Sequence, residues 1–266
     1  MTITTIDPGY VAAAKQWPVT LAKTASRTST AFGAYSVFDL AGSPGAGALA
    51  VGNTVNGVVA TDAAAGYPTI NDFASGGLGY LTRVRATNTV PCNLWLYDRV
   101  WKAGAYAFNA NQVLASQPTY TSRVPGSDFK NLQLWLEAVT AFTGTPTIQV
   151  NYTNESGVAA RTTGAISLGV APILGQCFQL PFQSGDNGIQ KVEQVIGTVA
   201  SAGTFNINVL RPLWFGRIDV ANDATVEDLL ATGMPQLFQD SGLFLLVQPD
   251  STATGLPSVM IEVANG

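Results

Sequence analysis

The stretch KNLQLWLEAV, residues 130–139, decides the fold class. In it, apolar side chains at every second position alternate with larger polar or aromatic ones: Leu132, Leu134, Leu136 and Ala138 against Gln133, Trp135 and Glu137. Successive side chains of a β-strand point to opposite faces of the sheet, so a period of two residues predicts a strand with one face in the core. We therefore expect Leu134 and Leu136 to be buried.

The same period recurs along the middle of the chain. PTIQVNYTN (146–154) and TFNINVL (204–210) place one set of apolar side chains on a common face: Ile148, Val150, Tyr152, Phe205, Ile207 and Val209. The turn-forming segments TGTP, SGDNG and SAG lie between such runs, and no 10–15-residue helical pattern separates them. The pattern predicts an all-β fold, an antiparallel, jelly-roll-like β-sandwich with at least six strands between Gly79 and Val220.

The C-terminal region predicts one short helix and a hairpin. In NDATVEDLLATG (222–233), Asp223 is a suitable N-cap, Glu227 and Asp228 favour the positive end of the helix dipole, and Gly233 suits the position after the helix. The apolar runs GLFLLVQP (242–249) and SVMIEVA (258–264) then predict a terminal hairpin at the edge of the sheet.

Residues 1–78 differ from the rest of the chain. Between Arg27 and Arg83 the only charged residues are Asp39, Asp62 and Asp72, and the segment is rich in alanine and glycine. Small side chains offer little apolar surface to offset the entropy of ordering, which predicts an extended N-terminal arm (1–78) beside a β-sandwich domain (79–266). The alternative is that these residues fold back as further strands of the sandwich.

The composition limits the possible functions. The chain has 266 residues, 13 Lys and Arg, a net charge of −4 and no histidine. A basic stripe for nucleic acid and an uninterrupted apolar run for a membrane span are both missing, so neither partner is expected. Without histidine, the usual general base and metal ligand is lost, and we expect no enzyme activity, no catalytic residue, no bound metal and no cofactor.

The acidic residues and the cysteines give no catalytic pattern either. Five carboxylates are candidates for paired-acid chemistry only because they exist, since no spacing singles out a pair: Asp98, Asp128, Glu137, Asp186 and Glu193. Cys92 and Cys177 are expected to be small buried apolar residues.

The aromatic stretch LWLYDRVW (94–101) has two readings. Trp95, Tyr97 and Trp101 surround the pair Asp98–Arg99 in a chain with only 11% charged residues. We interpret the stretch as sheet core and interface, with Asp98–Arg99 fixing a strand end by charge-assisted hydrogen bonds. An exposed Trp–Tyr strip that stacks on sugar rings is the alternative.

Three segments in order, LWLYDRVW, GTPTIQVNYTNESGVAARTTG and FQLPFQSGDNGIQKVEQV, resemble a family of tailed-bacteriophage virion structural proteins, the head decoration or cement proteins. The resemblance covers about residues 79–215. It implies a β-sandwich made in the host cytoplasm and displayed on the capsid exterior, bound to the major capsid protein. It also implies a symmetric homo-oligomer, with a trimer as the first expectation.

The N-terminal arm offers three apolar side chains as candidate anchors for such a partner: Trp17, Tyr35 and Phe38. The alternatives to a decoration protein are a carbohydrate-binding tail or fibre module, and a structural component of the tail or baseplate.

Overall fold

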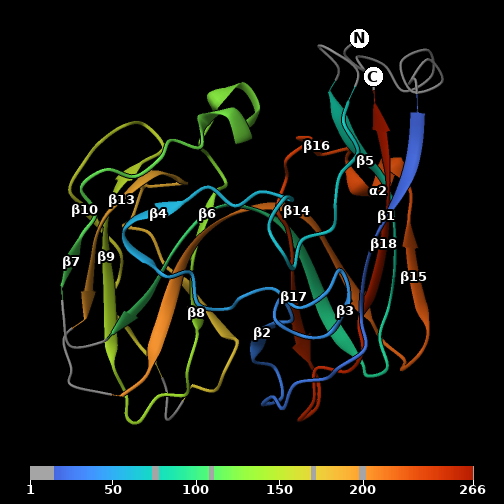
Figure 1. The fold of residues 1–266 in the computed structure, drawn as a ribbon, viewed down its shortest axis with the longest axis horizontal. Coiled ribbons are helices and arrows are strands. Elements are labelled where there is room, and N and C mark those ends of the chain that lie inside the picture. The colour runs from blue at the N-terminus through green and yellow to red at the C-terminus, as the bar shows by residue number, and fades with distance from the viewer. Residues whose placement is uncertain (1–14, 74–77, 108–110, 169–171, 198–201, 266) are drawn as a thin grey trace.

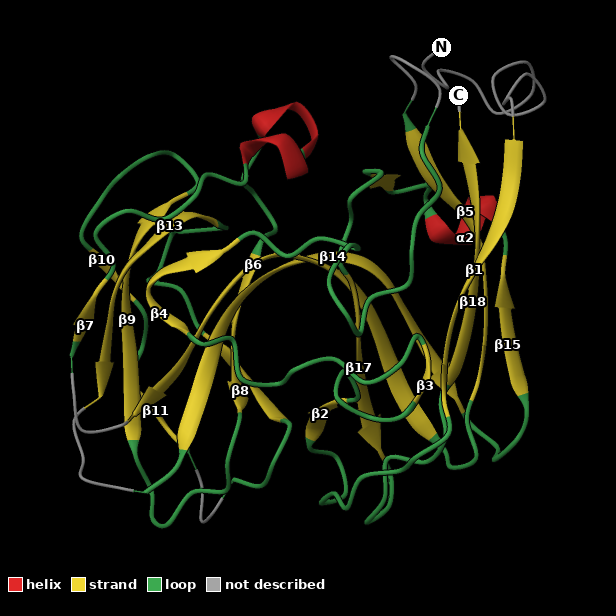
Figure 2. Ribbon diagram, in the orientation of Figure 1, coloured by secondary structure: helices red, strands yellow, loops and turns green. Residues whose placement is uncertain are grey.

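The fold consists of three antiparallel β-sheets. The computed structural model describes residues 15–73, 78–107, 111–168, 172–197 and 202–265. Within them the helices are one short α-helix, α2 (Leu229–Thr232), and two 3₁₀ turns at Thr121–Arg123 and Pro125–Ser127. Strands dominate both views of the molecule (Figure 1, Figure 2).

The central sheet closes on itself. Its strands follow the order β14 (Thr204–Ile218), β8 (Gln133–Ala138), β12 (Gln176–Leu180), β2 (Ala34–Ser36), β17 (Leu243–Pro249), β6 (Cys92–Ala107) and β4 (Asn53–Val58). An additional pairing of β14 with β6 joins the two sides, so these strands, apart from β4, form a closed barrel. Figure 2 shows them around the middle of the molecule.

Two further sheets flank this barrel. The first has the order β15 (Ala224–Glu227), β5 (Gly79–Thr87), β18 (Ser258–Asn265), β1 (Lys15–Lys23) and β3 (Gly42–Ser43), with β16 (Gln236–Leu237) beside β5. The second has the order β10 (Arg161–Thr162), β9 (Thr147–Asn154), β13 (Ile189–Gly197) and β7 (Gln112–Val113), with β11 (Ile166–Ser167) beside β9. They lie on opposite sides of the central strands in Figure 1.

The two longest strands, β6 and β14, extend past both flanking sheets. β6 and β14 span 16 and 15 residues, and they pair along nearly their whole lengths with three register shifts. The first half of β6 packs Leu94 and Leu96 against the first flanking sheet, and its second half packs Val100 and Ala103 against the second. One strand pair therefore serves two sandwiches.

Strand β8 buries side chains on both of its faces, which the alternation of its sequence explains. On β8, Leu134 and Leu136 point to the core shared with the second flanking sheet, whereas Trp135 belongs to a third core inside the barrel. Glu137, on the same face as Trp135, is also fully buried. The predicted alternation is correct, but the face of β8 opposite the leucines lies in the barrel interior and not in solvent.

These observations confirm the predicted all-β, antiparallel sandwich. Every side chain that the alternation placed in the core is buried: Leu132, Leu134, Leu136, Ala138, Ile148, Val150, Tyr152, Phe205, Ile207 and Val209. The segment between Gly79 and Val220 holds β5 to β14, more than the six strands predicted.

Truncating Leu136 is expected to destabilise the protein by about 2–5 kcal/mol, because a fully buried side chain would leave a cavity between well-packed sheets. Chemical denaturation of Leu136→Ala measures this loss. Leu230→Ala is the matched control, since Leu230 is 71% exposed and should change stability by less than about 0.5 kcal/mol. Equal stability of the two variants would contradict the assignment of the core.

The extended arm expected for residues 1–78 is corrected for residues 15–73. β1 pairs with β18 over eight residue pairs, from Lys15 opposite Asn265 to Ala22 opposite Ser258. β2 joins β12 to β17 and so completes the barrel, and β4 pairs with β6. Residues 15–73 therefore follow the alternative interpretation, in which this region supplies further strands of the same fold. Residues 1–14 of the expected arm lie outside the described residues.

The small side chains that suggested a flexible arm are a packing requirement. Gly57 lies against the Trp101 ring at a φ of 66°, and a Cβ there would come within 2.2 Å of that ring. A Cβ on Gly47 would come equally close to the ring of Phe38. These two glycines let the segment lie directly on aromatic rings of the core, so the absence of a side chain at these positions indicates close packing.

Two C-terminal predictions are wrong in detail. The helix begins only at Leu229, where the Asp228 carboxylate accepts hydrogen bonds from the backbone N–H groups of Leu230 and Ala231, whereas Ala224–Glu227 form β15 along β5. Gly233 does follow the helix in the left-handed conformation, at a φ of 66°. The last two strands form no edge hairpin, because β17 lies in the barrel and β18 lies between β5 and β1.

Candidate functional site

The stretch LWLYDRVW lies in the middle of β6, where its side chains alternate between two cores. Leu94 and Leu96 enter the core beside the first flanking sheet, whereas Trp95 and Tyr97 belong to the barrel interior. Asp98 and Arg99 are both fully buried, point to opposite faces of the strand, and find separate partners. They do not fix a strand end, as the sequence suggested, because β6 continues to Ala107.

On the outer side of the barrel, Asp98 connects three parts of the chain that are distant in sequence. Its carboxylate accepts hydrogen bonds from Arg123, from Arg211 at 2.9 Å and from the Ser241 hydroxyl at 3.0 Å. Arg123 also donates to the Ala60 carbonyl at 2.8 Å. With every oxygen of the carboxylate engaged by strong donors, Asp98 holds the strands together and is not free to react.

Arg99 and Glu137 form the ionic centre of the barrel interior. The guanidinium lies 3.4 Å from a carboxylate oxygen of Glu137, and its carbon sits 3.6 Å from the ring centroid of Phe244. The amides of Asn206 and Asn208 donate to the same carboxylate at 3.2 and 3.4 Å. Glu137 is therefore compensated by one cation and two amides inside a ring of aromatic side chains.

Lys102 adds a second positive charge next to this pair. Its ammonium nitrogen lies 5.3 and 5.4 Å from the ring centroids of Phe38 and Tyr67. Burial lowers the pKa of Lys102 to about 8, with a further decrease from the Arg99 guanidinium and an opposing effect from Glu137.

Replacing Lys102 with methionine is expected to raise stability at pH 7 by about 1–3 kcal/mol, because the folded state disfavours the charged lysine. Between the folded pKa near 8 and the unfolded value of about 10.4, the unfolded state binds more protons, so wild-type stability rises with pH in this window. The advantage of Lys102→Met should therefore shrink from pH 8 to 10. Denaturation at several pH values measures it, with Lys130→Met, whose side chain is 60% exposed, as control. A difference that does not vary with pH would contradict the assignment.

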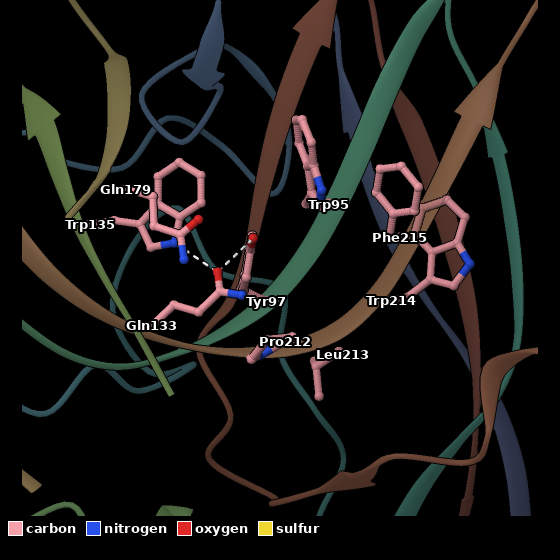
Figure 3. A pocket seen from close by; sticks show the side chains of 9 residues that line it. All are labelled: Trp95, Tyr97, Gln133, Trp135, Gln179, Pro212, Leu213, Trp214 and Phe215. Carbon is pink, nitrogen blue, oxygen red and sulfur yellow. Dashed lines mark hydrogen bonds between the residues drawn. The ribbon is translucent and has the colours of Figure 1, made fainter. Parts of the chain in front are cut away.

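The barrel has one filled end and one open end. Phe38, Ala60 and Tyr67, from the segment after β2, fill the end where Arg99 and Lys102 lie. Trp95 and Tyr97 come earlier on β6 and mark the opposite end, where a pocket of about 470 Å³ opens. We call this pocket the barrel mouth; it is lined by Trp95, Tyr97, Gln133, Trp135, Gln179, Pro212, Leu213, Trp214 and Phe215 (Figure 3).

Aromatic rings form one wall of the barrel mouth. Trp95 of β6 and Phe215 of β14 are direct partners in the strand register, and their ring centroids are 5.5 Å apart. Phe215 is 55% exposed, and Trp95 is partly exposed. The Trp214 indole beside them donates to Glu227 at 2.8 Å and is held by it.

Two glutamines form the polar part of the barrel mouth. The Oε1 atom of Gln133 accepts hydrogen bonds from the Trp135 indole at 2.9 Å and from the Tyr97 hydroxyl at 3.1 Å, as Figure 3 shows. An indole N–H can only donate, so these bonds fix which end of the amide is oxygen. The Gln133 Nε2 atom has no hydrogen bond to another described residue, and the Gln179 side chain is exposed.

The three residues predicted as partner anchors lie in separate places. Trp17 on β1 is partly buried and packs against Phe73, with ring centroids 5.7 Å apart. Tyr35 is fully buried, with its hydroxyl bonded to the backbone N–H of Thr30 at 2.8 Å. Phe38 is 4% exposed and contributes to the filled end of the barrel. Tyr35 and Phe38 therefore serve the core, and only Trp17 keeps exposed surface.

The remaining acidic candidates have structural partners. Asp186 accepts from two guanidinium nitrogens of Arg161, Nε and Nη2, and from the Tyr152 hydroxyl, and the hydrogen bond with Arg161 is the main reason that its pKa falls to about 2. Glu193 accepts from the Thr153 hydroxyl at 2.8 Å. Asp128 is exposed beside Lys130. The segment SGDNG (184–188) forms a turn, as predicted, and Asp186 links this turn to β9.

The cysteines are buried free thiols, as expected. Cys92 belongs to the core beside the first flanking sheet and Cys177 to the barrel interior, and burial raises the pKa of both, to about 11 for Cys92. Among the described residues, no three or more Cys, Asp or Glu side chains gather closely enough to bind a metal ion. In the same part of the chain, no helix has the length and apolar character needed to span a membrane.

Comparisons with known proteins assign no family, since neither a protein-family model nor a curated protein matches the chain. Among solved structures, an unassembled VP1 pentamer of KI polyomavirus has 9% identity and a TM-score of 0.24, over 100% of this chain and 97% of that chain. A structure of the Gx strain of infectious bursal disease virus has 9% identity and a TM-score of 0.17, over 94% and 80%. TM-scores this low do not establish a common fold.

Sequence reasoning located only two of the nine residues that line the barrel mouth. LWLYDRVW drew attention to Trp95 and Tyr97, but Gln179, Trp214 and Phe215 were missed because they join the site only through strand register. The available signal was the alternation itself, since Gln133 and Trp135 occupy the face of β8 opposite the leucines. Glutamine is common at solvent-facing positions, so the tryptophan on this face was the signal that the face is covered.

Proposed function

We propose that the chain is a structural virion protein, a decoration or cement protein that binds the outside of a bacteriophage head and stabilises it. The observation that carries the proposal is the use of the buried charges. Asp98 and Glu137, the two fully buried carboxylates among the described residues, are bound by arginines and amides that connect strands of the barrel with one another and with turns packed on it. The buried carboxylates therefore stabilise the fold and are not available for a reaction. The sequence resemblance over about residues 79–215 supports a role in a virion.

A rigid, disulfide-free scaffold suits a protein that bridges capsid subunits. The strands β6 and β14 run continuously through both sandwiches, so a load applied to one flanking sheet is carried to the other by paired backbone. No reaction is needed for this task, and we propose no enzyme activity. The partner would be the major capsid protein, and the protein would act as a homo-oligomer, with a trimer as the first expectation for threefold positions on the shell.

Binding to heads tests the proposal. Purified protein is mixed with heads that lack it, the heads are sedimented, and their resistance to heat is measured. Saturable binding together with a higher disruption temperature supports the proposal, whereas no binding at micromolar protein overturns it. Light scattering on the free protein checks the trimer, which should have three times the 27.8 kDa mass of the chain.

Trp17 is the surface residue to vary in this assay. Trp17→Ala should weaken head binding, and Phe32→Ala, which removes another aromatic side chain with 66% exposure, is the matched control. Thermal unfolding of both variants separates loss of contact from loss of fold, because Trp17 also packs on the core. Equal binding of both variants would remove Trp17 from the interface.

A carbohydrate-binding tail or fibre module is the second candidate function, and the barrel mouth alone favours it. A tail or baseplate component would share the same scaffold and differ by its position on the virion.

A further inference from the structure

We propose that the barrel mouth binds a neutral saccharide. This inference does not depend on where the chain sits on a virion, and it assigns a ligand to a pocket that the scaffold role leaves without a purpose. Mouths of β-barrels are common ligand sites, typically with aromatic walls and a few convergent polar groups. The barrel mouth has both, and each can be related to the chemistry of a sugar ring.

The aromatic wall offers a stacking surface. Trp95 and Phe215 lie side by side on paired strands, with centroids 5.5 Å apart and an angle of 38° between their planes. The negative face of an aromatic ring attracts the weakly positive C–H groups on the apolar face of a pyranose. The 55% exposure of Phe215 means that this surface is available and is not closed by the fold.

The glutamines offer the complementary hydrogen bonds. Trp135 and Tyr97 hold the Gln133 amide by its oxygen, so its Nε2 group is presented as a fixed donor (Figure 3). Gln179, directly opposite Trp135 in the register of β12 and β8, brings both an amide donor and an acceptor. Sugar hydroxyls donate and accept at once, and amide side chains match this pattern better than groups that only donate or only accept.

The absence of charge selects a neutral sugar. None of the nine residues that line the barrel mouth carries a charge at neutral pH, since Tyr97 is the only titratable one, its hydroxyl donates to Gln133, and burial raises its pKa further above neutrality. The nearby carboxylates of Asp98 and Glu137 are already compensated by arginines within the fold. A sialic or uronic acid would lose water around its carboxylate without meeting a cation in the pocket.

A proline-rich peptide fits the pocket less well. Recognition of such a peptide uses aromatic grooves whose side chains also bond the backbone carbonyls of the peptide. Here the indole N–H groups of Trp135 and Trp214 are consumed by Gln133 and Glu227. Among the described residues, the side-chain donors of the barrel mouth that remain are the amides of Gln133 and Gln179 and the indole N–H of Trp95, and the amides suit hydroxyl groups.

The test uses the full chain and a panel of neutral hexasaccharides built from glucose, galactose, mannose and N-acetylglucosamine. Binding is measured by tryptophan fluorescence and by calorimetry. At least one member should bind, and Trp95→Ala and Gln179→Ala should each weaken that binding by about tenfold or more. Phe32→Ala, an exposed aromatic residue outside the barrel mouth, should leave it unchanged.

Gln179→Ala keeps the proposal testable if Trp95→Ala fails to fold, because Gln179 is exposed and bears no core contact that the fold requires. Failure of every saccharide to bind, or binding that neither variant weakens, would overturn the proposal. Binding of sialylated glycans alone, binding of a polyproline peptide with no saccharide, or self-association abolished by Trp95→Ala with no saccharide binding would overturn it equally. Head binding is measured separately, so its failure would leave the saccharide result intact.

Discussion

Replacing Asp98 with asparagine is expected to destabilise the protein by about 3–5 kcal/mol, because it leaves two buried arginines without their counter-ion. Asp98 is fully buried, Arg123 is 1% exposed and Arg211 is 8% exposed, so water cannot take over the lost interaction. The same carboxylate binds Ser241, and the change therefore loosens the contact of β6 with β14 and with the turn before β17 at once.

Denaturant titration of Asp98→Asn measures this loss, with Asp219→Asn as the matched control. Asp219 pairs with Arg217 at 2.9 Å, but its side chain is 82% exposed, and a surface pair of this kind contributes at most about 1 kcal/mol. If Asp98→Asn were as stable as Asp219→Asn, the buried ion network would not be holding β6, β14 and the neighbouring turns together.

Deleting residues 1–70 is expected to prevent folding altogether. The deletion removes β1 to β4, and with β2 the barrel loses the strand that connects β12 to β17. It also exposes the face of β18 that β1 covers and empties the filled end of the barrel, where Phe38 and Tyr67 pack. The expected product is insoluble, or lacks the cooperative unfolding transition of the full chain.

Deletion of residues 1–14 is the matched control, since it leaves every described strand in place. Circular dichroism and thermal unfolding of the two truncated chains decide the matter. A folded, soluble core without residues 1–70 would restore the arm interpretation and contradict the pairings of β1, β2 and β4.

The strands could be predicted because the alternation of apolar and polar residues is visible within each short stretch of sequence. Leu134, Leu136, Ile148 and Val150 each face a core shared by two sheets, and a period of two residues identifies such positions without knowledge of the partner. The sequence could not show that the opposite face is buried as well. From the sequence, Glu137 would be expected to face solvent, because its partner Arg99 is 38 positions away in the chain.

The errors near the termini have a common cause. Ala224–Glu227 look helical from their caps and charges, yet β5 offers an unpaired edge, and pairing with it takes precedence over local preference. In the same way, Gly47 and Gly57 suggested flexible chain because their aromatic partners, Phe38 and Trp101, are set only by the fold. The candidate site follows this rule: Trp95 and Tyr97 were visible in one stretch, whereas Gln179 and Phe215 reach them through register.

Cryo-electron microscopy of intact virions that carry this chain tests the proposed function most directly. The account predicts density for a closed barrel between two flanking sheets on the outer surface of the head, repeated at threefold positions and in contact with the major capsid protein. Density for this fold only in the tail or baseplate, or only inside the shell, would contradict it.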